Sequence, residues 1–135
     1  MIVSLHVASG GVAGAVAGSR GRAVLLGALM HLMGDRMPHR DISNRRFEVW
    51  SGTLALLALA LRRGPLDPVT VGAAAGSAPD VEHLFRLPRP GGRKLFPSHR
   101  IRGWHRTGGV SASLQLLAGG VLLGLLLASR RSVGQ

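Results

Sequence analysis

Residues 5–18 read LHVASGGVAGAVAG, an apolar run in which His6, Gly10, Gly14 and Gly18 recur at every fourth position. Residues four apart lie on one face of an α-helix. Small residues on such a face allow two helix backbones to approach closely, as they do in membrane helix pairs. This stretch therefore predicts a helix that packs through its glycine face, and the face begins at a histidine.

The same spacing recurs in three further segments, and each stripe of small residues again includes a polar residue. The stripes are Gly27, His31 and Asp35; Gly72, Gly76 and Asp80; and His105, Gly109 and Ser113, continued by Gly120 and Gly124. We expect each striped face to point into the interior of a helical bundle, which would bring the polar residues inside as well.

Apolar segments separated by basic stretches make up most of the chain; they cover residues 5–18, 23–33, 49–61, 69–78 and 110–128. Only the last approaches the ~20 apolar residues of a membrane-spanning helix. The 135 residues are 46% hydrophobic but 4% aromatic, with 20 glycines, a composition typical of helices packed closely in lipid. We therefore expect one all-α domain over residues 1–135, a small membrane-embedded bundle of about five helices with a polar metal-type site at one end.

Charge and composition limit the classes of molecule that the protein is expected to bind. The chain has 17 Lys and Arg against 6 Asp and Glu, a formal net charge of +11. Nucleic-acid binding is not expected, because aromatic residues for base stacking are few and no nucleic-acid motif is recognisable. Two explanations of the excess positive charge stay open. It could attract the protein to anionic membrane lipids, or arginines could recognise a phosphorylated substrate. Residues 1–7 contain no Lys or Arg, so a cleavable signal peptide is not expected.

The order of the segments predicts where the polar residues gather. Short connections favour neighbouring helices of alternating direction. His6 then begins the first helix at the same end where Asp35 closes the second and Asp80 closes the fourth. The other histidines fall at that end too; they are His31, His39, His83, His99 and His105. Eleven of the 17 Lys and Arg lie there as well, which by the positive-inside rule predicts a cytoplasmic site end.

Two short motifs have the spacing of a metal site. His31 and Asp35 are one helical turn apart and can chelate one ion, and Asp80 and His83 form the i, i+3 equivalent. Because the chain has no cysteine, the ligands are nitrogen and oxygen, which favours a divalent ion, with zinc expected first and manganese or iron as alternatives. The predicted metal ligands are His6, His31, Asp35, Asp80, His83, His99 and His105. His39 is expected at the rim, and Glu48 is an additional candidate ligand.

These motifs resemble those of the bacterial membrane-bound metal-dependent hydrolases. That family carries an N-terminal histidine, a Pro-Asp-x-Asp-His signature, a His-Arg-Gly-x-x-His segment and a His-x-x-x-Asp helix. The corresponding residues here are His6, the run PDVEH at 79–83, the run HRIRGWH at 99–105, and HLMGD at 31–35. The order of the motifs differs, and Glu82 stands where the signature has an aspartate.

The resemblance implies an integral protein of the bacterial inner membrane that hydrolyses a phosphate ester or a lipid-like substrate with a metal ion. Glu82 is the candidate for proton transfer. The candidates for binding the substrate phosphate are Arg100, Arg102 and Arg106. The alternative is a non-catalytic membrane protein in which the same polar cluster is structural, binds metal for stability or serves transport.

Overall fold

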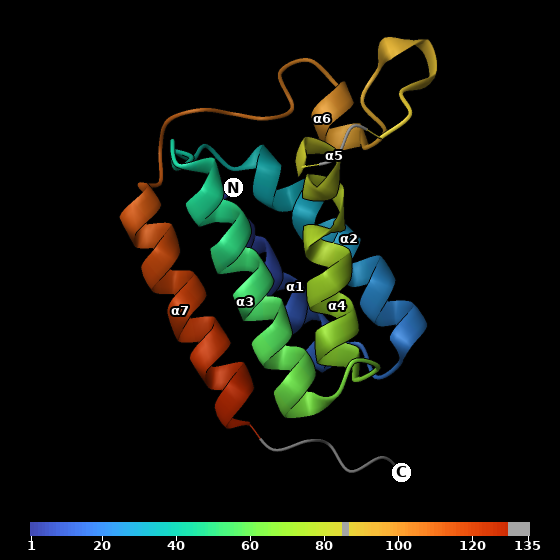
Figure 1. The fold of residues 1–135 in the computed structure, drawn as a ribbon, viewed down its shortest axis with the longest axis vertical. Coiled ribbons are helices and arrows are strands. Elements are labelled where there is room, and N and C mark those ends of the chain that lie inside the picture. The colour runs from blue at the N-terminus through green and yellow to red at the C-terminus, as the bar shows by residue number, and fades with distance from the viewer. Residues whose placement is uncertain (85–86, 130–135) are drawn as a thin grey trace.

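The computed structural model describes residues 1–84 and 87–129 and is built from helices, with no β-strand in these residues (Figure 1). The prediction of an all-α fold is confirmed. The long helices follow the five apolar segments; they are α1 (Val3–Val16), α2 (Arg20–Arg36), α3 (Arg45–Arg63), α4 (Pro68–Ser77) and α7 (Ala112–Ala128). Short elements fill the connection between the last two; they are η1 (Ala78–Asp80), α5 (Val81–Leu84), η2 (Pro90–Gly92) and α6 (Pro97–Arg100).

Side-chain caps determine where most of the long helices begin. The side chains of Ser19, Asn44, Asp67 and Ser111 each accept a hydrogen bond from a backbone N–H in the first turn of α2, α3, α4 and α7. Such caps satisfy donors that have no partner inside the helix. They also explain why α2 and α3 start a few residues before the apolar segments of the sequence.

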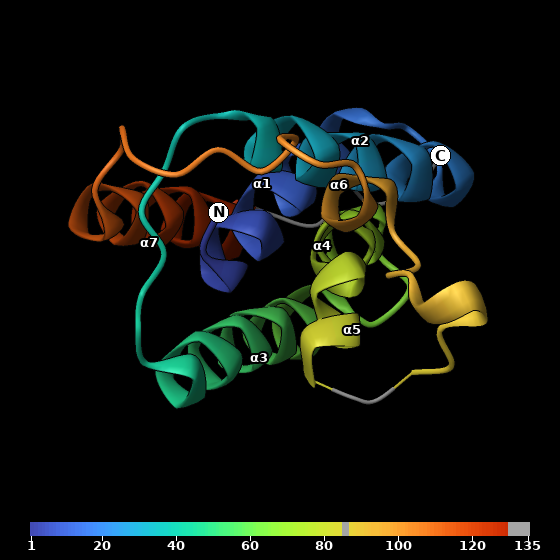
Figure 2. The ribbon, with the colours of Figure 1, turned by 90° about the horizontal axis from the view of Figure 1, so that it is seen from above.

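Helix α1 lies in the middle of the bundle and packs against α2, α3, α4 and α7 (Figures 1 and 2). Its closest neighbour is α4, and glycines make the approach possible. A methyl group on Gly10 would collide with the backbone of Gly72, and one on Gly76 would lie 2.8 Å from the carbonyl oxygen of His6. Gly27 of α2 meets α4 in the same way. We call this contact of Gly10, Gly14, Gly27, Gly72 and Gly76 the glycine seam.

The predicted orientation of the last stripe of small residues, which includes Gly120 and Gly124, is wrong. Gly120 and Gly124 are exposed, and no atom of the described residues lies within 4 Å of a side chain added at either. Gly119 faces α1 instead, against Leu5. His105 and Gly109 also lie outside α7, which begins only after the turn at Gly108 and Gly109, both with positive φ. The break restarts the helical phase at the Ser111 cap, so the spacing across it does not define one face.

The prediction of membrane-spanning helices, on which the integral membrane localisation depended, is also wrong. In residues 1–84 and 87–129, no helix combines the length and the apolar character needed to cross a membrane. Helix α7 is apolar but has 17 residues between its serine caps. Helix α3 has 19 residues, but arginines occupy both of its ends. The glycine-rich composition that suggested lipid packing serves the glycine seam between short helices.

Candidate metal centre

The helix directions bring polar residues from distant parts of the chain to one end of the bundle. Helix α1 begins where α2 and α4 end, so His6 lies beside the last turn of α2 (Figure 1). The connection from α5 to α7 runs over the same end and adds His99. We call the resulting group the inner cluster. It consists of His6, His31, Asp35, Asp80, His83 and His99, six of the seven predicted ligands.

His31 is held with one ring nitrogen facing a carboxylate. Its Nδ1 donates to the carbonyl oxygen of Gly76 at 2.8 Å, so Nδ1 must carry a proton. In the neutral ring Nε2 then holds a lone pair, and it lies 3.1 Å from Oδ2 of Asp35. Two acceptors at this distance need a positive charge, either a second proton on the ring or a cation between them.

His99 is oriented in the same way by Glu82. The buried Glu82 carboxylate accepts from Nδ1 of His99 at 2.5 Å and from the backbone N–H of Leu95 at 2.7 Å. Nε2 of His99 therefore faces Oδ2 of Asp35 at 3.4 Å and Oδ1 of Asp80 at 3.8 Å. A carboxylate behind a histidine is the usual support of a metal ligand, because it fixes the tautomer and the ring orientation.

Four buried atoms of the inner cluster have no hydrogen-bond partner among the described residues. They are His6 Nδ1, His31 Nε2, Asp35 Oδ2 and Asp80 Oδ2, here called the open atoms. The rings of His6 and His31 also stack with centroids 4.0 Å apart, a contact that two charged imidazoles would disfavour. Buried polar groups are nearly always paired, so the open atoms point to a ligand.

The electrostatics of the cluster keep His6 and His83 neutral beside an ionised Asp35, whereas the pKa of His99 is raised: burial alone would lower it, but the Asp35 and Glu82 carboxylates outweigh the burial. Burial lowers the pKa of His6 to about 3, with His31 adding to the effect. Burial alone would raise the pKa of Asp35, but the surrounding rings of His31, His6 and His99 hold it well below its usual range. Burial raises the pKa of Asp80 to about 6, and the Asp35 charge contributes. Burial and the neighbouring His99 lower the pKa of His83 to about 4.

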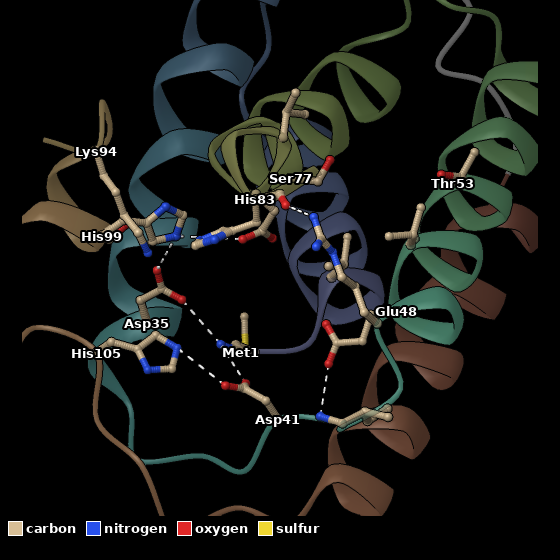
Figure 3. A pocket seen from close by; sticks show the side chains of 18 of the residues that line it. Met1, Asp35, Asp41, Glu48, Thr53, Ser77, His83, Lys94, His99 and His105 are labelled. Atoms are coloured by element: carbon tan, nitrogen blue, oxygen red, sulfur yellow. Dashed lines mark hydrogen bonds and ion pairs between the residues drawn. The ribbon is translucent and has the colours of Figure 1, made fainter. Parts of the chain in front are cut away.

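A second group lies on the other side of Asp35 and is called the outer cluster; its members are His39, Asp41 and His105. Nε2 of His39 lies 3.1 Å from Nε2 of His105 and 3.1 Å from Oδ1 of Asp41. The Met1 ammonium lies 3.3 Å from Oδ1 of Asp35 (Figure 3). It also contacts Nε2 of His39. His105 is thus the one predicted ligand that lies outside the inner cluster.

Contacts with α2 and its extension position the loop that carries His99 and His105. Trp104 donates its indole N–H to the carbonyl of Leu32, and the guanidinium of Arg36 lies 5.5 Å from the Trp104 ring centre. His39 exchanges backbone hydrogen bonds with the loop, donating to Arg106 and accepting from Gly108. Gly109 has φ +67°, and a side chain there would strike Pro38, so this crossing requires glycine.

A cavity of about 750 Å³ opens beside both clusters (Figure 3). Asp35, Asp80 and His99 line it from the inner cluster, and Asp41 and His105 from the outer cluster. Its remaining wall is chemically mixed. Arg45 and Lys94 are basic and Glu48 is acidic, whereas a set of apolar side chains continues away from the clusters; they are Val3, Val49, Leu56, Val81 and Ile101. The cavity therefore offers a polar floor, positive charge and an apolar wall.

Several predicted residues lie differently from their expected roles. Both oxygens of Glu82 are occupied, so it orients His99 rather than facing a reacting group. Arg100 and Arg102 line a separate hollow beside His99, and the exposed Arg106 does not line the main cavity. Glu48 accepts from the backbone N–H of Ile42 at 3.0 Å and lies on the cavity wall, apart from the metal-type groups.

Four groups of three residues have ligand atoms close enough to hold a metal ion. They are His6, His31 and Asp80; His31, Asp35 and His99; Asp80, His83 and His99; and Asp35, His39 and His105. Sequence reasoning placed His39 at the rim, yet it is 2% exposed. The run PHRD at 38–41, directly after the predicted His-x-x-x-Asp pair, was the available signal for His39 and Asp41.

Comparisons with known proteins add no family to this geometry: no family model matches the chain, and no curated protein or solved structure is significantly similar to it. The resemblance to the metal-dependent hydrolases therefore stays a prediction from the motifs alone.

Proposed function

We propose that the protein is a metal-dependent hydrolase that acts on a phosphate ester carrying an apolar group. The observation behind the proposal is that four buried atoms of the inner cluster have no partner among the described residues, beside a cavity with basic and apolar walls that Asp35, Asp80 and His99 line. We assign the metal to His31, Asp35 and His99, whose ligand atoms lie within 4.8 Å of one another, with Asp80, His6 and His83 around them.

The spacing of the ligand atoms suits zinc. A tetrahedral zinc ion, about 2.0–2.1 Å from its ligands, separates neighbouring ligand atoms by roughly 3.3–3.4 Å. The separations from Asp35 Oδ2 are 3.1 Å to His31 and 3.4 Å to His99, and His99 lies 3.8 Å from Asp80. Nitrogen and oxygen ligands also accept manganese or iron, so zinc is the first metal to test.

The cavity favours catalysis over a purely structural site. A structural zinc site is closed by protein ligands, whereas a catalytic one keeps a position open. His6 and His31 lie behind the proposed ion, while Asp35, Asp80 and His99 line the cavity, so one side stays accessible. An ion held there would lower the pKa of a coordinated water towards neutrality.

The cavity walls support the substrate class. Arg45 and Lys94 supply positive charge beside the ligands, which suits a phosphate group. The apolar wall formed by Val49, Leu56 and Val81 suits a hydrocarbon portion of the same molecule. Glu82 keeps the Nε2 lone pair of His99 directed at the metal position, which is a positioning role.

The test is a phosphoesterase assay on protein whose metal content has been measured. Alkyl phosphates of increasing chain length would be compared after loading with zinc, manganese or iron. We expect metal-dependent hydrolysis that improves with chain length and is lost in His99→Ala. Arg45→Ala should raise KM, while Arg22→Ala, an exposed arginine at the opposite end, should not. Full metal occupancy without hydrolysis of any ester would support the non-catalytic alternative instead.

A further inference from the structure

The outer cluster shares Asp35 with the inner cluster. Oδ2 of Asp35 faces His31 and His99. Oδ1 lies 3.2 Å from Nε2 of His6 and 3.3 Å from the Met1 ammonium, which is on the outer side (Figure 3). The ligand atoms of Asp35, His39 and His105 lie within 4.8 Å of one another. One buried carboxylate is therefore placed between two groups of metal-type ligands.

The hydrogen bond behind His39 fixes its ring as it does for His31. Nδ1 of His39 donates to the carbonyl of Met37 at 2.6 Å, so Nε2 carries the lone pair of the neutral ring. That lone pair faces Oδ1 of Asp41 at 3.1 Å, and a carboxylate oxygen can only accept. The outer cluster, like the inner one, gathers acceptors around a place that requires positive charge.

We propose that a second divalent cation binds among Asp35, His39, Asp41 and His105, with the Asp35 carboxylate bridging the two ions. The inference rests on the proposed function for the first ion and adds the number of ions and the ligands of the second. The nitrogen of Met1 lies 3.3 Å from Oδ1 of Asp35 and 3.7 Å from Oδ1 of Asp41, so a cation bound at this place would have to displace it.

The geometry fits this assignment. Nε2 of His39 lies 3.1 Å from both His105 and Asp41, and His105 lies 3.8 Å from the other oxygen of Asp41. These separations match those around an ion with ligands at about 2.0–2.2 Å. A carboxylate bridge would separate the ions by about 3.5–4 Å, the spacing of two-metal hydrolytic centres.

The second position would also face the substrate. Asp41 and His105 line the same cavity as Asp80 and His99, so both ions would be accessible from one side. Two ions at this spacing can contact two oxygens of one phosphate group. A dinuclear centre thus gives the cavity a recognition element for phosphate in addition to Arg45 and Lys94.

The test counts ions. Wild-type protein and variants are dialysed against zinc and analysed for zinc per mole by mass spectrometry, after circular dichroism has shown them to be folded. We expect two zinc ions in the wild type and in the control Asp67→Asn, and one in His105→Ala and in His39→Gln. His105 is partly exposed, so its replacement removes a ligand without opening the core.

Manganese loading gives a second readout, because two carboxylate-bridged Mn(II) ions couple magnetically and one does not. The coupled spectrum should be present in the wild type and absent in His105→Ala. One zinc ion in the wild type, lost in His99→Ala but retained in His105→Ala, would overturn the second site and leave the proposed function standing. No bound ion in any sample would overturn both.

Discussion

The two ends of the bundle both bury charge, but they satisfy it differently. At the end formed by the α3–α4 turn and the end of α7, Arg63 is 7% exposed and donates to Asp67, to the carbonyls of Leu126 and Ser129 and to the Ser129 hydroxyl. At the other end, the inner cluster includes four open atoms. A buried charge that has all its partners needs no further group, and removing one partner is costly, whereas buried polar atoms without partners point to a ligand.

A pair of matched substitutions tests this comparison with the largest expected effect. Asp35→Asn should lose more than nine-tenths of the bound zinc, because it removes the one carboxylate shared by both clusters. Replacing a residue that only supports a metal ligand already costs about 10–100-fold in metal affinity, and Asp35 is itself a proposed ligand. Asp67→Asn, at the opposite end, should retain the zinc of the wild type. The measurement is zinc content after dialysis at a fixed free concentration.

Asp67→Asn should act on the stability of the metal-free protein instead of on its zinc content. Asp67 caps α4 and pairs with Arg63, so its loss should lower the free energy of unfolding. If Asp67→Asn also removed the zinc, the two ends would be coupled and the comparison would fail.

Arg63→Met sharpens the structural half of the comparison. Removing one partner of a buried charge network costs about 3 kcal/mol in unfolding free energy, and Arg63 joins α3 to both Asp67 and α7. Arg22→Met, an exposed arginine at the same end, should change stability by no more than ~0.5 kcal/mol. Denaturant unfolding of the metal-free proteins gives both values, and zinc content should stay that of the wild type.

The glycine seam can be compared with the glycines of α7 in the same assay. A methyl group at Gly72 would strike the backbone of Gly10 and Gly14, so Gly72→Ala should destabilise by about 2 kcal/mol. At Gly120 the described residues leave open space, and Gly120→Ala should stabilise α7 by up to ~1 kcal/mol through helix propensity. Equal losses for the two variants would show that α7 packs through Gly120 after all.

The smallest expected effect is a pH dependence caused by His6. Because burial lowers its pKa in the folded protein from 6.5 to about 3, the unfolded chain binds the proton more readily. The stability contributed by neutral His6 is therefore full above about pH 6.5 and falls as the pH decreases towards 3. Between pH 7.5 and 5 the metal-free wild type should lose about 1–2 kcal/mol more than His6→Gln. Parallel pH profiles for the two proteins would contradict the buried neutral assignment.

The helical spacing of residues and the alternating direction of neighbouring helices were sufficient to predict the helices and the end of the bundle at which the histidines gather. The spacing of His31 and Asp35 depends only on the geometry of one helix, and His6 meets them because adjacent helices run in opposite directions. Helical spacing and the opposite direction of adjacent helices both act over short stretches of chain, so both can be predicted from the sequence.

The rest depends on tertiary contacts that no local pattern encodes. His39 and Asp41 follow Pro38 in a connection, and their place is determined by backbone pairing with residues 106–110. Glu82 lies off the face of Asp80 and His83, so a solvated rim charge, a partner of a metal ligand and proton transfer all stayed open for it; its contact with His99, 17 residues away, lies beyond any helical spacing. The apolar composition suggested membrane spans. The glycine and alanine faces instead pair with one another between short helices, and the sequence alone does not show this pairing.

The central claim is that the inner cluster is a metal site, and anomalous diffraction from crystals of zinc-loaded protein tests it most directly. Data collected on both sides of the zinc absorption edge locate the ion without reference to activity. The account predicts a strong peak within bonding distance of His31 Nε2, Asp35 Oδ2 and His99 Nε2, with Glu82 still bound to Nδ1 of His99. A zinc-loaded crystal in which these atoms carry no anomalous peak, or in which the peaks lie only on exposed histidines, would contradict it.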